Sequence, residues 1–344
     1  CIFKIAVMKY SYIIGQQHIK EHFRSAVVNG VINHAYIING EKSSGKAMLA
    51  KTFAMSIMCD SGGSEPCMEC ESCRKTANNA NPDVRTLVRD PKKKTDIIGI
   101  DEVRQQIISG MYERPYNGDH KIYIIDDADK MNVQAQNAIL KTLEEPPGYA
   151  VLLLITRNAS RLLPTILSRC IILNMRPVED KEIKQFLTER GRASINDIDV
   201  ITALSGGNPG KAKLLSEDSE FSGFLSSITD ILKSVTNSGF REILDSVETL
   251  SAIKEKKKYT PEDIFELMNM WYRDVMLFKA TKETGKLIFK NEATSIALQA
   301  NYFTYEALNN TVKMIDDAKR KLDSNVKFES VMELLLINIQ EMSK

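Results

Sequence analysis

Apolar and polar residues follow two different periods along the chain, and the period changes near residue 177. Before that point, short apolar runs alternate with segments whose apolar residues recur every three or four positions. The short runs predict strands at residues 35–39, 84–88, 122–125, 151–155 and 171–173. The segments with helical spacing predict helices that include residues 46–58, 100–112 and 132–143. Such alternation is typical of a parallel sheet whose strands are joined by crossover helices.

The second part of the sequence predicts helices only. Residues 180–215 are expected to form a small helical segment, interrupted by a Gly-Gly-Asn-Pro-Gly run at 206–210. One face of the predicted helix 261–282 carries the apolar residues Ile264, Leu267, Met268, Trp271, Val275 and Phe278. This stripe favours the core of a helix bundle. We therefore expect an α/β module at 8–177, a helical lid at 178–218 and an all-α domain at 219–344.

Composition indicates a soluble globular protein of two or three domains. Of the 344 residues, 43% are hydrophobic and 26% are charged, and no apolar run approaches the roughly 18 uncharged residues of a membrane-spanning helix. We therefore expect a cytoplasmic protein without membrane contact. The net charge of +1 is small for a domain that grips nucleic acid electrostatically, so any DNA contact is expected to be shared with partners. Residues 1–7 precede Met8, where we expect the native start.

A phosphate-binding loop follows the first predicted strand. Residues 40–47 read Gly-Glu-Lys-Ser-Ser-Gly-Lys-Ala, which matches the P-loop pattern up to its last position. The phosphate-binding candidates are Gly40, Ser43, Ser44, Gly45 and Lys46. Ala47 stands where a Ser or Thr hydroxyl would bind Mg²⁺, and hydrolysis needs that cation to neutralise charge on the phosphates. The loop therefore predicts a site that could bind ATP without hydrolysing it.

Two acids follow the third predicted strand and complete the expected site. Asp126 is the candidate on the metal side, and Asp127 occupies the position at which active ATPases usually carry a Glu that polarises the attacking water. Asp127 is shorter by one methylene, about 1.5 Å of reach, and a displacement on that scale can cost about 10²-fold in rate. Thr156, at the end of the fourth predicted strand, is expected to hydrogen-bond a γ-phosphate or the attacking water.

Four cysteines after the P-loop helix predict a structural zinc site. Cys59, Cys67, Cys70 and Cys73 lie in an insertion that contains Gly, Ser and Pro, with two consecutive CxxC spacings. Four thiolates suit one tetrahedral Zn²⁺ and leave no open position for catalysis. Disulfides are disfavoured in the cytosol, and unrelated buried cysteines rarely have this spacing. Cys170 stands apart and is not counted as a ligand.

Arg169 is the candidate for a contribution to a second subunit. Ser168, Arg169 and Cys170 precede the last predicted strand, and an arginine exposed there can serve a phosphate of a neighbouring subunit. A surface salt bridge is the alternative for an arginine considered in isolation.

Taken together, these motifs resemble the bacterial clamp-loader branch of the AAA+ ATPases. The resemblance rests on the P-loop, the four cysteines and residues 125–131, 137–147 and 168–170, and residues 320–339 are similar to the family's C-terminal collar. It implies an AAA+ module with a zinc-binding insertion at 59–73, a helical lid, and a collar that joins a five-subunit ring. The implied partners are other loader subunits, the sliding clamp and, through the complex, primer-template DNA.

Departures from the family pattern indicate which kind of subunit this is. Ala47 and Asp127 weaken hydrolysis, and Gly210 stands where motor subunits carry an arginine that senses nucleotide, whereas Arg169 is intact. The resemblance thus implies a subunit whose own hydrolysis is impaired and whose Arg169 stabilises the γ-phosphate of a neighbour. Two alternatives stay open: an active loader ATPase, and a nucleotide-independent scaffold in which the P-loop is only a turn.

Overall fold

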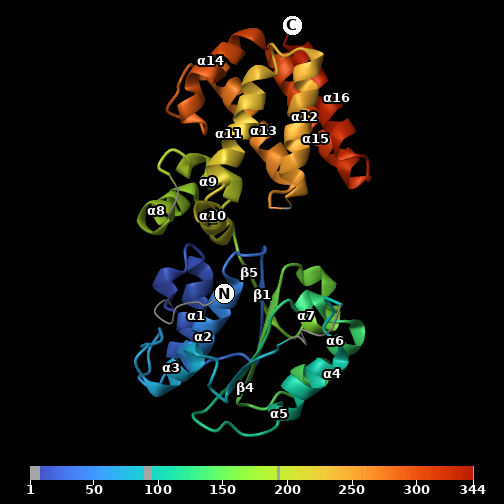
Figure 1. Ribbon diagram of the computed structural model, residues 1–344. Helices are drawn as coiled ribbons and strands as arrows, with labels where there is room; N and C mark the ends of the chain where they lie inside the picture. Colours follow the sequence, from blue (N-terminus) through green and yellow to red (C-terminus); the bar gives the residue numbers. More distant parts are fainter. Residues whose placement is uncertain (1–7, 89–94, 192–193, 257, 344) are drawn as a thin grey trace. The chain divides into compact units, whose positions relative to one another are not determined.

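The computed structural model describes residues 8–88, 95–191, 194–256 and 258–343 (Figure 1). Residues 1–7, which precede the expected native start at Met8, lie outside this range. The chain divides into two compact units, which are described separately below. Unit 1 comprises residues up to Glu182 together with Asn208–Lys211, and unit 2 comprises Ile183–Gly207 and Ala212–Lys344. The three-domain division expected from sequence stays a prediction.

Unit 1 is built on a parallel sheet of five strands. The strands are β1 (Ala35–Asn39), β2 (Val84–Thr86), β3 (Lys121–Ile125), β4 (Ala150–Thr156) and β5 (Ile171–Asn174). Their order across the sheet is β2-β3-β4-β1-β5, and every neighbouring pair is parallel. All five predicted strands are present, so the predicted α/β class with a parallel sheet is confirmed.

Strand β2 ends two residues earlier than the sequence predicts, and the Val88 backbone beyond it is bonded to a side chain. The Val88 N–H donates to Gln106 Oε1 at 2.9 Å, and Gln106 Nε2 donates to the Val88 carbonyl at 2.8 Å. Leu87 still donates its N–H to the Ile124 carbonyl of β3, so the Val88 groups face the outer side of this edge strand, where their bonds to Gln106 block pairing with a further strand.

Helices cover both faces of the sheet in unit 1. On one face lie α1 (Gln17–Val28), α2 (Lys46–Ile57) and α3 (Glu71–Ala77), and on the other lie α4 (Ile100–Val103), η2 (Arg104–Ile108), α5 (Ser109–Met111), α6 (Val133–Glu144) and α7 (Pro164–Leu167) (Figure 1). Short 3₁₀ turns are η1 (Tyr10–Tyr12), η3 (Ala128–Lys130) and η4 (Ala159–Arg161). The helix predicted at 100–112 is present, with a π-helical turn at η2.

Strand alternation divides the core of unit 1 into two layers. Tyr36 and Ile38 of β1 are buried with Phe23 and Phe53, whose rings stack at 3.8 Å. Ile37, between them in sequence, is buried in the cluster on the opposite face with residues of α4, η2 and α6. Side chains of a strand point alternately to its two faces, so β1 is buried on both sides, as expected for a central parallel strand.

The helices after the sheet are α8 (Asp180–Arg190), α9 (Ile198–Ser205), α10 (Pro209–Ser216), α11 (Phe221–Ser234), α12 (Phe240–Glu255), α13 (Pro261–Thr281), α14 (Ala293–Tyr302), α15 (Tyr305–Asp323) and α16 (Phe328–Met342), with a 3₁₀ turn η5 (Lys290–Glu292). Within unit 2, α13 packs against α11, α14 and α15. The helical character predicted for this part is confirmed. No described helix combines the length and the apolar character that crossing a bilayer requires.

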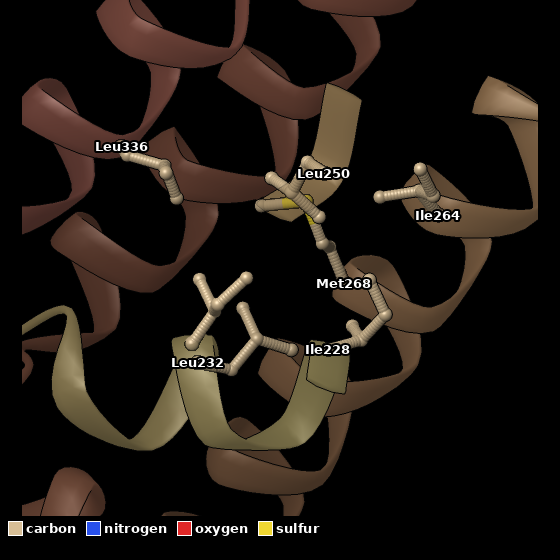
Figure 2. Close-up of a pocket in the computed structure, with 7 residues that line it drawn as sticks. Ile228, Leu232, Leu250, Ile264, Met268 and Leu336 are labelled. Carbon is tan, nitrogen blue, oxygen red and sulfur yellow. The ribbon is translucent and has the colours of Figure 1, made fainter. Parts of the chain in front are cut away.

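The apolar stripe on α13 forms the centre of unit 2, as predicted. Its residues are buried except for Phe278, which is half-buried. Figure 2 shows Leu232, Leu250, Met268 and Leu336, contributed by four different helices, around one small apolar void. The indole N–H of Trp271 donates to Gln299 Oε1 at 2.8 Å, so the one tryptophan of the chain is fixed inside this unit.

Candidate nucleotide site and cysteine cluster

Three neighbouring strands of unit 1 deliver the predicted nucleotide-site residues to one edge of the sheet. The P-loop follows β1, Thr156 ends β4, and Asp126 and Asp127 follow β3. Strand β4 lies between the other two, and Asn39 pairs with Thr156 at their carboxyl ends. Because carboxyl ends of parallel strands meet at one edge, residues more than 100 positions apart converge there. Ligands of open α/β sheets bind at this edge.

The P-loop itself has the backbone conformation of a tight strand-to-helix turn. Ser43 and Gly45 have positive φ angles of 64° and 96°, and α2 begins at Lys46. The Lys46 side chain is buried, and its Nζ donates to the Gly40 carbonyl at 2.6 Å and to the Glu41 carbonyl. Burial lowers the pKa of Lys46, and the negative charge of Asp126 opposes this effect more strongly than the positive charge of Arg157 adds to it. The Lys46 ammonium group therefore rests on the P-loop itself, the loop at which it is expected to contact a bound phosphate.

The two acids after β3 have different surroundings. Asp127 adopts a left-handed backbone conformation with φ of 52°, and its own N–H donates to Asp126 Oδ1 at 2.9 Å. Its carboxylate pairs with Lys130 at 2.8 Å and with Arg157 at 3.5 Å. One cation faces each oxygen of this carboxylate, so the lone pairs that would accept a proton from water are directed at cations instead. The charge of Asp127, the residue at the position expected to polarise water, is thus neutralised by Lys130 and Arg157 of the same chain.

Thr156 is buried and is engaged by an acid that the sequence did not single out. Its hydroxyl donates to Asp129 Oδ1 at 2.9 Å, and the Arg157 N–H donates to the same oxygen at 3.1 Å. Asp129 therefore holds the end of β4 beside η3. The signals in the sequence were slight: a third acid in the run 126–129, and an arginine directly after the candidate threonine.

Residues 208–211 belong to unit 1 because they lie on the P-loop. The side-chain amide of Asn208 donates to the Lys42 carbonyl at 2.8 Å, and its Oδ1 accepts from the Gly210 N–H at 3.1 Å. A Cβ added to Gly210 would lie 1.9 Å from the Ser43 carbonyl oxygen. Gly210 therefore permits a close backbone approach of residues 208–211 to the P-loop. Asn208 was not predicted as a site residue.

Arg169 lies at the amino ends of the parallel strands, whereas the P-loop lies at their carboxyl ends. It comes two residues before β5, whose first residue Ile171 pairs with Tyr36 near the amino end of β1, whereas the P-loop follows the carboxyl end. Its guanidinium pairs with Glu144 at 3.0 Å and donates to the Thr165 carbonyl at 3.0 Å. The salt bridge that the sequence left as an alternative is present, and the Arg169 side chain remains 35% exposed.

The four cysteines are brought together as the spacing predicts. Cys59 follows α2, Cys67 lies in the loop, Cys70 caps the amino end of α3, and Cys73 lies within that helix. All four sulfur atoms lie within 4.8 Å of one another. An ideal tetrahedron with Zn–S distances of about 2.3 Å has sulfurs about 3.8 Å apart, so this cluster fits the ion with small adjustments.

Hydrogen bonds around the cysteines also suit thiolates. Backbone N–H groups donate to Cys59 Sγ at 3.4 Å, to Cys67 Sγ at 3.2 Å and to Cys70 Sγ at 3.3 Å. Hydrogen bonds led by that from Ser61 lower the pKa of Cys67 to about 6, whereas burial raises the pKa of Cys73. Four neighbouring thiolates repel one another, and a divalent cation at their centre removes that cost. Cys170 lies beside the core cluster on the other face of the sheet, away from these four.

Comparison with known proteins identifies the family. A family model described as DNA polymerase III, delta subunit, matches residues 15–179, and one described as its C-terminal region matches residues 224–341. The DNA polymerase III subunit delta′ of Bacillus subtilis is 30% identical over 315 residues, which cover 90% of this chain and 92% of that protein. The chain belongs to the DNA polymerase III delta-prime family.

Other relatives of this delta-prime family member have related names. The DNA polymerase III subunit tau of B. subtilis is 28% identical over 334 residues, and the match covers 88% of this chain but only 57% of tau. A solved DNA polymerase III gamma subunit-related protein from Thermotoga maritima covers 94% of this chain and 99% of its own length, at 20% identity and a TM-score of 0.41. A likeness at that level supports no functional statement.

Proposed function

We propose that this chain is the delta-prime subunit of the DNA polymerase III clamp loader in DNA replication. In this role it helps to load the sliding clamp onto primed DNA. It donates Arg169 to the ATP of a neighbouring subunit, while its own ATP hydrolysis is impaired. The expected partners are the delta and gamma/tau subunits, the sliding clamp and, through the complex, primer-template DNA.

The observation that carries the proposal is the separation of Arg169 from the chain's own P-loop. The two lie beyond opposite ends of β1, which has five residues, about 17 Å at 3.3 Å per residue. An arginine side chain cannot span that length, so Arg169 has no access to a phosphate bound in its own subunit. A phosphate that it stabilises must therefore be bound by another chain, which is the arrangement of a trans arginine finger.

Impaired hydrolysis in the chain's own site is supported by three residues. Ala47 offers no hydroxyl to Mg²⁺, Asp127 is paired with two cations, and the Thr156 hydroxyl donates to Asp129. Each change removes a group that would contact the metal, the attacking water or the γ-phosphate. Together they favour the impaired subunit over the active gamma/tau-like ATPase that remains the alternative.

Zinc is proposed as the structural ion of unit 1. Cys59, Cys67, Cys70 and Cys73 would hold it with four thiolates, which fixes the segment between α2 and α3. A site closed by four cysteines offers no position to a substrate, so the ion would contribute to folding and not to chemistry.

The proposal is tested by reconstituting the complex with wild-type chain or with Arg169→Ala. We expect assembly to be unchanged and turnover at the site that Arg169 serves to fall by about 10³ or more, as for other arginine fingers. The DNA-stimulated ATPase rate of the whole complex should fall by at least the fraction of turnover that this one site contributes. Arg161→Ala, a change of another exposed arginine in the same part of unit 1, is the matched control. Unchanged ATPase with Arg169→Ala would reject the trans role.

A simpler measurement distinguishes the proposed subunit from the alternative, an active gamma/tau-like ATPase. An active gamma/tau-like ATPase would turn over Mg²⁺ATP as an isolated chain, and the proposed subunit would not. Because the isolated chain has no neighbour, the result does not depend on Arg169.

A further inference from the structure

The cysteine cluster fixes one end of a short helix. Cys70 caps α3, and its Sγ accepts from the Cys73 N–H at 3.3 Å, so two of the four cysteines lie at the amino end of this helix. The carboxyl end is held from α2, because Lys51 Nζ donates to the Ala77 carbonyl at 3.0 Å. Helix α3 has seven residues, and helices shorter than about 12 residues are marginal in water without external contacts. Zinc on the cysteines would therefore hold one of the two ends of α3.

A buried asparagine connects α3 to the segment that leads into β2. The side-chain amide of Asn81 donates to Thr76 Oγ1 at 2.9 Å and to Ser72 Oγ at 3.4 Å, and both acceptors belong to α3. The Oδ1 atom of Asn81 accepts from the Asp83 N–H at 3.0 Å. Asn81 and Thr76 are both buried, so a lost bond here would leave a polar group without water. Asn81 thus ties the backbone of Asp83 to α3.

The Asp83 carboxylate in turn holds the loop that precedes β3. Both of its oxygens accept backbone N–H groups, from Tyr116 at 2.8 Å and from Asn117 at 2.7 Å. Backbone N–H bonds to a carboxylate are stronger than those between neutral groups, and Asp83 is fully buried. Residues 112–120 form no helix or strand. Two bonds to one side chain therefore hold a loop whose backbone has no ladder of its own.

The same loop also approaches the end of α2. A Cβ added to Gly118 would lie 3.9 Å from the Cε of Met58, the C-cap of α2 and the residue before the first cysteine. The beginning of the loop has a support that is independent of the cysteines, because the buried Lys121 pairs with Glu113 at 3.4 Å. Loss of the contacts with the insertion would thus loosen residues 116–118 and leave Glu113 in place.

We infer that the zinc-binding insertion positions the loop 112–120, through α3, Asn81 and Asp83. The inference rests on the zinc ion proposed above and gives it an effect outside residues 59–73. The loop presents Tyr116 to solvent, 71% exposed, on a backbone whose position the insertion fixes. Because the links are consecutive, removal of zinc and a break at Asn81 should have the same effect on the loop.

The test is hydrogen–deuterium exchange of the full-length chain, followed by mass spectrometry, with zinc bound and after chelation. We expect peptides that cover residues 112–120 to exchange about tenfold faster or more without zinc, the change expected when bonds to a carboxylate are lost. Peptides from β1 and β4 should not change, which establishes that the sheet stays folded. Cleavage by chymotrypsin after Tyr116 should become faster in the same zinc-free samples.

Asn81→Ala separates the link from the metal itself. This variant keeps all four cysteines, so we expect it to retain zinc and nevertheless to exchange faster in residues 112–120. Asp83→Asn keeps one oxygen acceptor and should give a smaller increase. Asn78→Ala, a change of an exposed asparagine at the C-cap of α3, is the matched control and should exchange as the wild type does.

Two results would overturn the inference. One is unchanged exchange of residues 112–120 in a zinc-free chain whose sheet stays folded, and the other is unchanged exchange in folded Asn81→Ala that retains zinc. If chelation unfolds the sheet as well, Asn81→Ala decides alone. A wild-type chain that holds no zinc would refute the zinc proposal and this inference together. None of these results bears on Arg169, whose role is tested in the assembled complex.

Discussion

Arg169 and Glu144 form an ion pair at 3.0 Å, at the sheet edge opposite the P-loop. Their side chains are 35% and 51% exposed, and an exposed pair of this kind contributes about 0 to 1 kcal/mol. The guanidinium also donates to the Thr165 carbonyl and to Ser168 Oγ, so α7 holds it in place as well. Arg169 is thus oriented before any partner arrives, and exchanging Glu144 for a phosphate would cost little.

Replacing Glu144 by Gln tests whether the pair only orients Arg169. The amide keeps an oxygen acceptor and removes the charge, so we expect a stability change within about 1 kcal/mol. DNA-stimulated ATPase of the reconstituted complex should stay within a few-fold of the wild type, far above the value for Arg169→Ala. Steady-state ATPase and thermal unfolding measure the two quantities. A loss equal to that of Arg169→Ala would give Glu144 a larger role than orientation.

Restoring an arginine at position 210 should not restore hydrolysis. Any side chain there places a Cβ 1.9 Å from the Ser43 carbonyl, so Gly210→Arg must push residues 208–211 off the P-loop. We expect a loss of about 1 to 3 kcal/mol, as for other overpacked sites, and faster proteolysis near this segment. Gly148→Ala is the control, because an added Cβ meets nothing within 4 Å there. ATPase activity gained by Gly210→Arg would contradict the expectation.

Removal of zinc should lower the thermal stability of unit 1. We expect about one zinc per chain in the wild type, loss of the metal in Cys70→Ser, and a lower unfolding temperature for the metal-free protein. Metal content by mass spectrometry and thermal unfolding by circular dichroism check this. Cys170→Ser should retain the zinc, because Cys170 lies in a different core cluster. An equimolar zinc content in Cys70→Ser would exclude the four-cysteine site.

Contacts that are local in sequence could be predicted, and those between distant segments could not. The cysteines lie within 15 positions of one another, and the P-loop is a continuous motif, so spacing alone identified both. The pairs Thr156 with Asp129, Arg157 with Asp127 and Asn208 with Lys42 join segments that only the sheet or the chain fold brings together. Composition and periodicity carry no information about which acid meets which cation at a strand end.

The buried amide of Gln299 should be required for the stability of unit 2. Gln299 Oε1 accepts from the indole of Trp271 at 2.8 Å, and its Nε2 donates to the Leu232 carbonyl at 2.6 Å, so one side chain of α14 links α13 and α11. Gln299→Ala leaves both partners buried without this bond. Each unsatisfied group costs about 1 to 3 kcal/mol, and we therefore expect a loss of roughly 2 to 6 kcal/mol from the two groups.

Trp271 makes this loss directly measurable. It is the only tryptophan of the chain and lies in unit 2, so its emission follows the unfolding of the helical unit during a urea titration. The midpoint for Gln299→Ala should shift to lower urea, and Leu298→Ala, a neighbouring change on α14 at a residue that is 53% exposed, should shift it little. An unchanged midpoint for Gln299→Ala would mean that water replaces the amide at this position, and the helices would then be held together by their apolar contacts alone.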